Sequence, residues 1–320
     1  MAISYKQREI RKTGIGASEI AAVCGMDKYN TPYHIWARKT DNLPDFEGNE
    51  YTKWGTILEP HILDEAELLL GQKITRPNPL LQDDNPEHID AGFYRHPDAP
   101  LFCNLDGWFT DNAIQKLAVI DAKASGDDTN WGTPWTDKVP DNYYLQIQAQ
   151  LACTGAGIGY LARWDRFTCE TTLYLIERDE EAIGLILEAA RDFWNNYVLT
   201  NTPPNRPPFP EPSLILQRTA ANASKTIELD PALVQAERDA RKAKEEAEAK
   251  HDEAKARVAL ALGDAKVGLA GMFKVQQILV KTKRLDAGAV QAKFPDVYEG
   301  CLVESQYAKL DIREVKEKKK

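Results

Sequence analysis

Two neighbouring segments alternate apolar and polar residues, which predicts two β-strands. They are residues 101–110, LFCNLDGWFT, and residues 117–125, LAVIDAKAS. The short polar segment between them, residues 111–116, predicts that the two strands form a hairpin. Positions 106 and 121 are placed symmetrically about the middle of that segment. The pattern therefore predicts an antiparallel pair in which Asp106 lies directly across from Asp121.

Two other segments have the hydrophobic period of a helix. Residues 54–71, WGTILEPHILDEAELLLG, predict a helix that is disturbed at Pro60 and ends at Gly71. If that helix is continuous, Glu59 lies on its apolar side, which is formed by Ile62, Leu63 and Ala66. Residues 141–155, DNYYLQIQAQLACTG, predict a second helix. Its polar line is Tyr143, Gln146 and Gln150, and its core-facing line is Tyr144, Ile147 and Leu151.

The N-terminal region combines basic residues with a glycine-containing turn. Arg8, Arg11 and Lys12 precede a short helix that we expect to begin near Ser18 and to end at Gly25. Helix N-termini attract anions, so this region is a candidate phosphate pocket. Capping of the helix by Ser18 is an equally good explanation of the same residues.

The C-terminal part begins after a proline-rich boundary. Residues 201–212, NTPPNRPPFPEP, predict a stiff extended connection. Residues 230–263 predict a long helix with a cap at Asp230 and a stop at Gly263, and a seam of alanines makes a solvated single helix and a coiled-coil pair equally good interpretations. Beyond it, residues 273–280 and 307–312 predict strands, residues 286–294 predict a helix, and residues 315–320 form a basic tail.

Composition narrows the classes of function. The 320-residue chain has a formal charge of −9, so any contact with DNA must be confined to local patches. Its five cysteines and five histidines lack the spacings of a zinc site or a disulfide framework. Charges interrupt the chain from Lys6 onward, which excludes an N-terminal signal peptide or membrane span in this stretch, and we expect a cytoplasmic protein.

The charges inside residues 117–125 give the strongest chemical indication. Asp121 and Lys123 share one face of the predicted strand, and Asp106 lies across from Asp121. Two facing carboxylates destabilise a sheet unless a cation lies between them. Carboxylate oxygens are ligands for Mg²⁺ or Mn²⁺, and a lysine beside them can orient a water molecule near a phosphate. The simpler alternatives are a structural ion pair on a half-exposed strand and, for Glu59, a carboxylate hydrogen-bonded at a bent helix start.

Five blocks in this order resemble one known family. The blocks are GIGASEIAAVCG, WGTILEP, LDGWF, IDAKAS and YYLQIQAQL, and they are similar to the YqaJ-type phage recombination nucleases, relatives of phage lambda exonuclease in the PD-(D/E)XK superfamily. The resemblance covers roughly residues 5–200. It implies an α/β (α+β) fold with a central mixed β-sheet flanked by helices. It also implies a nuclease domain at 1–200. The proline-rich pattern and the helix after it predict a linker at 201–213 and a C-terminal helical or coiled-coil region with a small α/β tail at 214–320.

The resemblance also implies the roles of individual residues. Asp106 and Asp121 take the two acidic positions of the superfamily motif, Lys123 takes the lysine position, and Glu59 matches the helix glutamate. Gln146 and Tyr143 match a helix beside the scissile phosphate. Arg11 and Ser18 match positions that hold a terminal 5′-phosphate, and the backbone carbonyl of Ala122 is expected to face a metal. Two departures are LDG in place of PDG, and Asp121 where close relatives usually have glutamate.

The implied activity is that of a Mg²⁺-dependent exonuclease, with Mn²⁺ as a second possible metal. It would digest one strand of duplex DNA from the 5′ end and leave a 3′ overhang for phage recombination by strand annealing. Relatives form ring-shaped homotrimers and work with a single-strand annealing protein, in the cytoplasm of a bacterial host of a phage or prophage. Two alternatives stay open. One is a sequence- or structure-specific endonuclease on the same core, and the other is a non-enzymatic DNA-binding or assembly protein.

Overall fold

The computed structural model describes residues 5–43, 48–126, 131–218, 226–281, 286–303 and 312, and the chain divides into two compact units, Met1–Arg218 and Thr219–Lys320. The helices of the first unit are α1 (Tyr5–Arg11), α2 (Ile20–Val23), α3 (Pro32–Lys39), α4 (Glu50–Leu70), α5 (Pro79–Asp84), α6 (Asp141–Thr154), α7 (Glu180–Phe193) and α8 (Pro212–Arg218). Its short helical turns are η1 (Ala17–Glu19), η2 (Ile89–Ala91) and η3 (Trp194–Val198). Its strands are β1 (Ile15–Gly16), β2 (Phe93–Arg95), β3 (Leu101–Asn104), β4 (Gly107–Asp111), β5 (Lys116–Ser125), β6 (Ile158–Asp165) and β7 (Thr171–Glu177).

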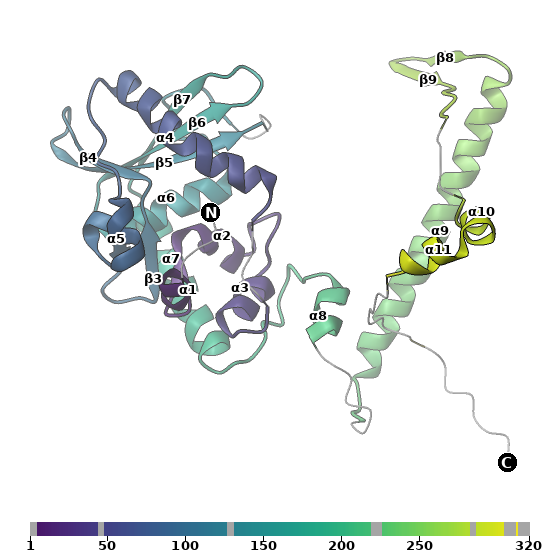
Figure 1. The fold of residues 1–320 in the computed structure, drawn as a ribbon, viewed down its shortest axis with the longest axis horizontal. Helices are drawn as coiled ribbons and strands as arrows, with labels where there is room; N and C mark the ends of the chain where they lie inside the picture. The colour runs from purple at the N-terminus through teal and green to yellow at the C-terminus, as the bar shows by residue number, and fades with distance from the viewer. Residues whose placement is uncertain are drawn as a thin grey trace. The chain divides into compact units, whose positions relative to one another are not determined.

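The centre of the first unit is a mixed sheet with the strand order β4-β5-β6-β7 (Figure 1). The pairs β4–β5 and β6–β7 are antiparallel, whereas β5 and β6 are parallel. A parallel neighbour requires a crossover connection, and α6 lies in the one that joins β5 to β6. This mixed sheet with flanking helices confirms the predicted fold class.

Helices cover both faces of this sheet. On one face, Ile62, Leu63 and Ala66 of α4 share a buried cluster with Ile120 and other residues of β4–β7. On the other face, Val119 of β5 belongs to a cluster that includes α6 and α7 residues. Successive residues of β5 therefore alternate between the α4 side and the α6 side, as a strand requires.

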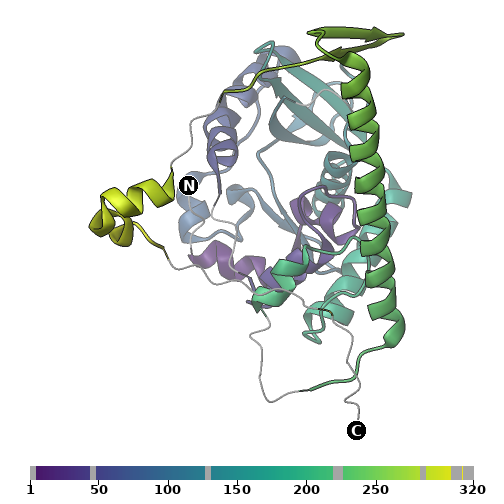
Figure 2. The same ribbon diagram turned by 90° about the vertical axis from the view of Figure 1, so that its right-hand side faces the viewer.

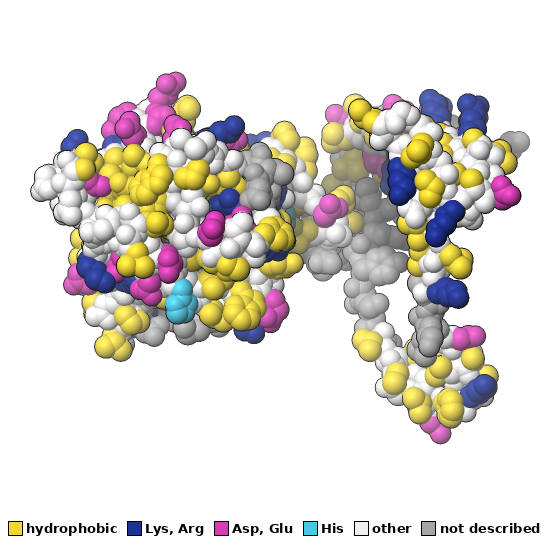
Figure 3. Space-filling view, turned by 90° about the horizontal axis from the view of Figure 1, so that it is seen from above, with side chains coloured by type: hydrophobic (Ala, Val, Ile, Leu, Met, Phe, Trp, Pro, Cys, Tyr) yellow, Lys and Arg dark blue, Asp and Glu magenta, His cyan; other side chains and the backbone are white. Residues whose placement is uncertain are grey.

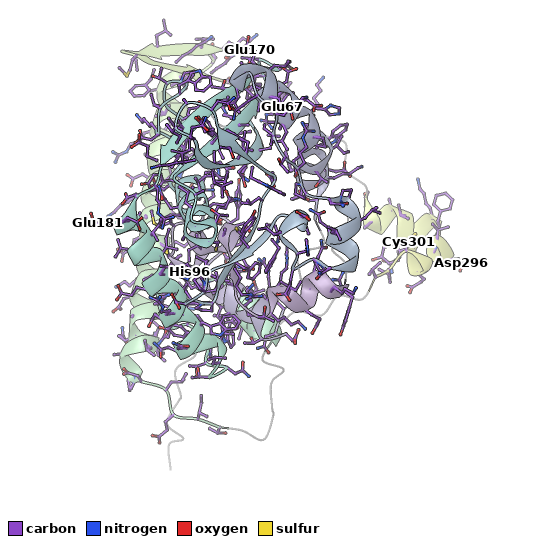
Figure 4. The ribbon with its side chains drawn as sticks, turned by 90° about the vertical axis from the view of Figure 1, so that its left-hand side faces the viewer. Glu67, His96, Glu170, Glu181, Asp296 and Cys301 are labelled. Carbon is purple, nitrogen blue, oxygen red and sulfur yellow. The ribbon has the colours of Figure 1, made fainter. Side chains whose placement is uncertain are left out.

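Helix α4 begins and ends at residues with clear capping roles. Asn49 accepts a hydrogen bond from the backbone of Thr52, and Gly71 ends the helix in the left-handed conformation (φ 66°). The helix starts earlier than residue 54, where the hydrophobic pattern placed it, because the cap at Asn49 lies outside that pattern. It continues through Pro60. Beyond its middle, Glu67, labelled in Figure 4, accepts a hydrogen bond from the backbone N–H of Ile74 and joins the helix to the following segment.

One glycine allows α6 to lie close to the sheet. A Cβ atom on Gly159 of β6 would lie 2.4 Å from Cγ2 of Ile147 on α6, a distance that real contacts do not reach. Ile147 is fully buried at this point. The absence of a side chain at position 159 therefore allows α6 to lie this close to β6.

The segment 101–110 is two strands and not one, which corrects the prediction of a single strand. Its first half is β3, which lies between β1 and β2 in a separate sheet, and its second half is β4 in the central sheet. The break falls at Leu105 and Asp106. There the backbone N–H of Leu105 still donates to the carbonyl of Gly92, next to the last β2–β3 pair, and Gly107 is the first residue that pairs with β5.

The proline-rich segment contacts the first unit. Arg206 donates to the carbonyl of Val23 over 3.3 Å, and its guanidinium lies over the ring of Tyr197. A Cβ atom on Gly25 would lie 2.8 Å from Pro208. These contacts group residues 201–218 with the first unit, and the predicted division at 201–213 stays a prediction.

The second unit contains α9 (Pro231–Leu262), β8 (Val267–Ala270), β9 (Phe273–Gln276), α10 (Ala287–Lys293) and α11 (Pro295–Gly300). Asp230 caps α9 and Gly263 ends it, as predicted, and the hairpin β8–β9 follows at its C-terminal end (Figure 2). The prediction of a coiled-coil partner for α9 is untested. The predicted strand 307–312 lies almost entirely outside the described residues, and the basic tail 315–320 lies wholly outside them.

The surface mixes residue types. On the face shown in Figure 3, acidic and basic side chains are interspersed with hydrophobic ones. Within the described part of the chain, no helix combines the length and the apolar character that crossing a membrane requires.

Candidate active site

The hairpin β4–β5 brings Asp106 and Asp121 together. Gly107 pairs with Ile120, so Asp106 lies one step beyond the last pair, next to Asp121, in the predicted register. Oδ2 of Asp106 accepts a hydrogen bond of 2.8 Å from the backbone N–H of Ala122. Burial and the neighbouring charge of Asp121 raise the pKa of Asp106 well above its usual range.

Lys123 forms an ion pair with Asp121 on the same face of β5. The pair joins Nζ of Lys123 to Oδ2 of Asp121, and only 2% of the Asp121 side chain is exposed. The Lys123 ammonium also lies 5.6 Å from the ring centre of Tyr143 on α6. Burial alone lowers the pKa of Lys123, but the charges of Asp121 and Asp106 outweigh it and raise that pKa. Lys123 is therefore a cation at neutral pH.

Glu59 contributes a third carboxylate from α4. Burial first, and then the charge of Asp121, raise the pKa of Glu59, while Lys123 acts in the opposite direction. The charge of Glu59 in turn contributes to the raised pKa of Asp106. Three carboxylates and one lysine thus influence one another electrostatically.

Two glutamine amides from α6 hold the remaining oxygen of Asp121. Nε2 of Gln146 donates to Oδ1 over 2.8 Å, and Nε2 of Gln150 donates to the same Oδ1 over 2.9 Å. The predicted polar line of α6 is therefore present, but it faces the strand and not solvent. Gln150 was placed on this line by its spacing of four residues from Gln146, but only Gln146 and Tyr143 were matched to residues of the family.

An aromatic cluster beside Lys123 was missed by the sequence analysis. Trp131 has its ring centre 5.6 Å from that of Tyr143 and 5.0 Å from that of Tyr174. The guanidinium of Arg163, the residue that pairs with Lys123 across β5 and β6, lies 4.8 Å from the Trp131 ring. These residues come from four separate segments, so no local pattern could have grouped them.

The part of the chain that matches a known protein family contains these residues. Residues 7–157 match the family described as YqaJ-like viral recombinase domain. Residues 7–157, which this family model matches, are called the YqaJ-like domain below after that likeness. All of the site residues predicted from the resemblance lie within this span.

Similar proteins are known from sequence and structure. An uncharacterized protein YqaJ from Bacillus subtilis (strain 168) is 25% identical over 318 residues, which cover 95% of this chain and 92% of that protein. An alkaline exonuclease from Laribacter hongkongensis matches 62% of this chain and 94% of its own, with 20% identity and a TM-score of 0.46. A phage related exonuclease from Haemophilus somnus 129PT matches 61% and 99%, with 14% identity and a TM-score of 0.42.

The N-terminal basic region of the YqaJ-like domain is ordered by a buried lysine. Nζ of Lys39 donates to the backbone carbonyl of Arg11 and to Glu19, whose carboxylate also accepts from the backbone N–H of Gly16 over 2.8 Å. Glu19, and not Ser18, therefore holds the start of η1. Arg11 and Ser18 are exposed, and no hydrogen bond or ion pair within the described ranges joins them to the carboxylates. The turn that carries Ser18, η1, packs against α6, whereas Arg11 is the last residue of α1.

The donor set of the YqaJ-like domain suits a hard divalent cation. The candidate ligands are all oxygens, the type that Mg²⁺ and Mn²⁺ prefer. Oδ2 of Asp121 is buried, and its partner is the Lys123 ammonium. As the described side chains stand, no three His, Cys, Asp or Glu residues are close enough together to bind a metal. A metal bound to Asp121 would therefore share this carboxylate with the Lys123 ammonium.

Proposed function

We propose that the YqaJ-like domain is a metal-dependent deoxyribonuclease that hydrolyses one strand of linear duplex DNA from its 5′ end. The product would be a 3′ single-stranded overhang, the substrate for strand annealing in recombination. One observation carries the proposal: Asp106, Asp121 and Lys123 lie together at one end of the hairpin β4–β5, within electrostatic range of Glu59. The description of the family as a viral recombinase domain supports the same biological process.

The acidic residues are assigned to metal binding. Asp106, Asp121, Glu59 and the backbone carbonyl of Ala122 would hold Mg²⁺, with Mn²⁺ as a second possible metal. When bound, such a metal lowers the pKa of a water molecule and stabilises charge on the phosphate. The raised pKa values of Asp106 and Glu59 support this assignment, because a divalent cation relieves the repulsion among the carboxylates.

Lys123 and Gln146 are assigned to positioning. The raised pKa of Lys123 keeps it protonated, so it acts as a hydrogen-bond donor to a water molecule or a phosphate oxygen and not as a general base. Gln146 is half-buried, and its Nε2 is bonded to Asp121, which leaves its amide oxygen to accept from a water molecule.

The 5′ polarity is assigned to the N-terminal basic region. Arg11 and Ser18 would bind the terminal phosphate and Tyr143 would contact the scissile strand, as the family resemblance implies. The contact of η1 with α6 supports this assignment, because it joins the elements that carry Ser18 and Tyr143. A ring-shaped homotrimer around the DNA and a single-strand annealing protein as partner belong to the same proposal and rest on the resemblance.

End-labelled DNA tests the activity and its direction. The purified chain should release 5′ label from a linear duplex in the presence of Mg²⁺ and should leave covalently closed circles intact. Lys123→Ala should lower turnover by orders of magnitude, because the lost contact acts on the reacting groups. Lys116→Ala is the matched control, because it removes an exposed lysine from the other end of the same strand. Cleavage of closed circles would favour an endonuclease, and no metal-dependent release would refute the proposal.

A second experiment tests the phosphate pocket. Duplexes with a 5′-phosphate should start faster than those with a 5′-hydroxyl, and Arg11→Ala should remove this difference while keeping metal-dependent cleavage. Arg8→Ala removes another exposed arginine of α1 and serves as the comparison. Equal initial rates on both ends with the wild-type chain would reject the pocket, and preferential loss of 3′ label would reverse the polarity.

A further inference from the structure

The segment QIQAQ places three glutamines at alternate positions of α6, and the structure gives them two different environments. Gln146 and Gln150 donate to Asp121. Gln148 points elsewhere: its Nε2 donates to the carbonyl of Glu177 over 2.7 Å, and its Oε1 accepts from the backbone N–H of Asp179 over 3.0 Å. Gln148 therefore bonds α6 to the junction of β7 and α7, and neither of these bonds involves Asp106, Asp121 or Glu59.

The bonds to Asp121 divide its two oxygens. Oδ1 accepts from both amides, whereas Oδ2 contacts the Lys123 ammonium. Rotation of the carboxylate out of its present plane would weaken both the amide bonds and the pair with Lys123. The two amide donors thus help to fix the plane of the Asp121 carboxylate, with one oxygen toward α6 and the other toward Lys123.

Gln150 differs from Gln146 in its exposure to solvent. Its side chain is fully buried, with 0% exposure, so it cannot touch DNA or a phosphate. Its Oε1 is buried and has no hydrogen-bond partner among the described residues, so its one bond in the structure is the one to Asp121. A buried amide that makes a single bond, to a candidate reacting group, is poorly explained as a device for stability.

We propose that Gln150 is a positioning residue, which holds the Asp121 carboxylate in the plane that turns its second oxygen toward the Lys123 ammonium and the proposed metal. This inference rests on the proposed function, because it concerns the carboxylate that the nuclease reaction requires. The physical basis is that hydrogen bonds donated to a metal-binding carboxylate fix its orientation and favour its charged form. Gln150 acts on the reaction only through Asp121.

The test compares Gln150→Met with Gln148→Met in the full chain. Methionine has a similar length and no amide donor, and both glutamines are fully buried on the same helix. Gln150→Met should weaken Mg²⁺ binding measured by calorimetry, or lower kcat on a linear duplex, by about 10–100-fold, the range seen when such supporting partners are removed. KM for DNA should not change, because Gln150 does not reach the substrate.

Gln148→Met should have the opposite effects, on stability and not on Mg²⁺ affinity or kcat. It should lower the melting temperature, because two backbone partners lose their bonds, while Mg²⁺ affinity and kcat stay at wild-type values. Gln150→His, which keeps an N–H donor, should recover part of the loss and covers the case in which Gln150→Met does not fold. Equal effects of the Gln148 and Gln150 variants on Mg²⁺ affinity would overturn the inference.

The two proposals fail in different ways. If the wild-type chain binds Mg²⁺ but releases no nucleotide, the proposed function is wrong. The Mg²⁺ affinities of the Gln150 and Gln148 variants then still test the positioning role of Gln150. If the wild-type chain is an active nuclease and Gln150→Met retains normal Mg²⁺ affinity and kcat, the role of Gln150 is wrong and the nuclease assignment stands.

Discussion

Replacing Lys123 with methionine should destabilise the metal-free protein and make it more dependent on Mg²⁺. The variant keeps most of the side-chain volume and removes the charge that neutralises Asp121. Removing one partner of a buried ion pair costs about 3–5 kcal/mol. The Lys123 side chain is 21% exposed and that of Asp121 only 2%, so water replaces part of the lost ammonium and the lower end of that range applies. A loss of about 3 kcal/mol lowers the melting temperature of a domain of this size by roughly 6–12 °C.

Thermal unfolding followed by circular dichroism, with EDTA and with Mg²⁺, measures both parts of this prediction. In EDTA the variant should melt well below the wild type. With Mg²⁺ at about 100 times the dissociation constant of the wild type, binding adds about 2.7 kcal/mol to the free energy of unfolding of the wild type. At the same Mg²⁺ concentration the rise in melting temperature should be larger in Lys123→Met, because the ammonium no longer competes with a divalent cation for the Asp121 carboxylate. Lys123→Arg, which keeps the charge, is the control.

Two results would refute this reasoning. Equal melting temperatures of the wild type and Lys123→Met in EDTA would show that the ion pair does not stabilise the folded state. An identical response of both proteins to Mg²⁺ would show that the ammonium and the metal do not compete for the same carboxylate.

Three further changes have defined outcomes. Asp106→Asn should abolish nuclease turnover yet raise the melting temperature in EDTA. The raised pKa of Asp106 means that its stabilising contribution is lost as pH rises above about 4, so this difference should widen toward neutral pH. Gly159→Val should cost about 1–3 kcal/mol in urea unfolding by crowding α6, and an unchanged urea midpoint would contradict it. Burial lowers the pKa of His34, whose Nδ1 accepts from the Thr31 N–H, so the free energy of unfolding should decrease as pH falls below about 6.5, and His34→Gln should remove that dependence.

Local patterns were sufficient where a structure depends on neighbouring residues. The alternation in residues 117–125, with a turn of defined length before it, predicted the register that places Asp106 beside Asp121. The helical period predicted the buried side of α4, formed by Ile62, Leu63 and Ala66. The caps at Asp230 and Gly263 predicted both ends of α9.

Features that depend on distant contacts were not predictable in this way. The division of residues 101–110 between two sheets depends on pairing with β2 in the first half and with β5 in the second, which no period reveals. Periodicity placed Gln150 on one line with Gln146 and left Gln148 off it, but it could not identify their partners, because α6 is buried both against β5 and against the junction of β7 and α7. The cluster around Trp131 requires the pairing of β5 with β6, which brings Arg163 beside Lys123.

The contact between Gly159 and Ile147 makes two positions, one on β6 and one on α6, share a single volume. A larger residue at 159 and a smaller one at 147 would fill that volume equally well, whereas a change at one position alone would alter the distance over which Gln146 and Gln150 reach Asp121. We therefore expect related sequences to vary these two positions together, with total size kept constant. The orientation of the Asp121 carboxylate therefore depends in part on two uncharged residues that make no bond to it.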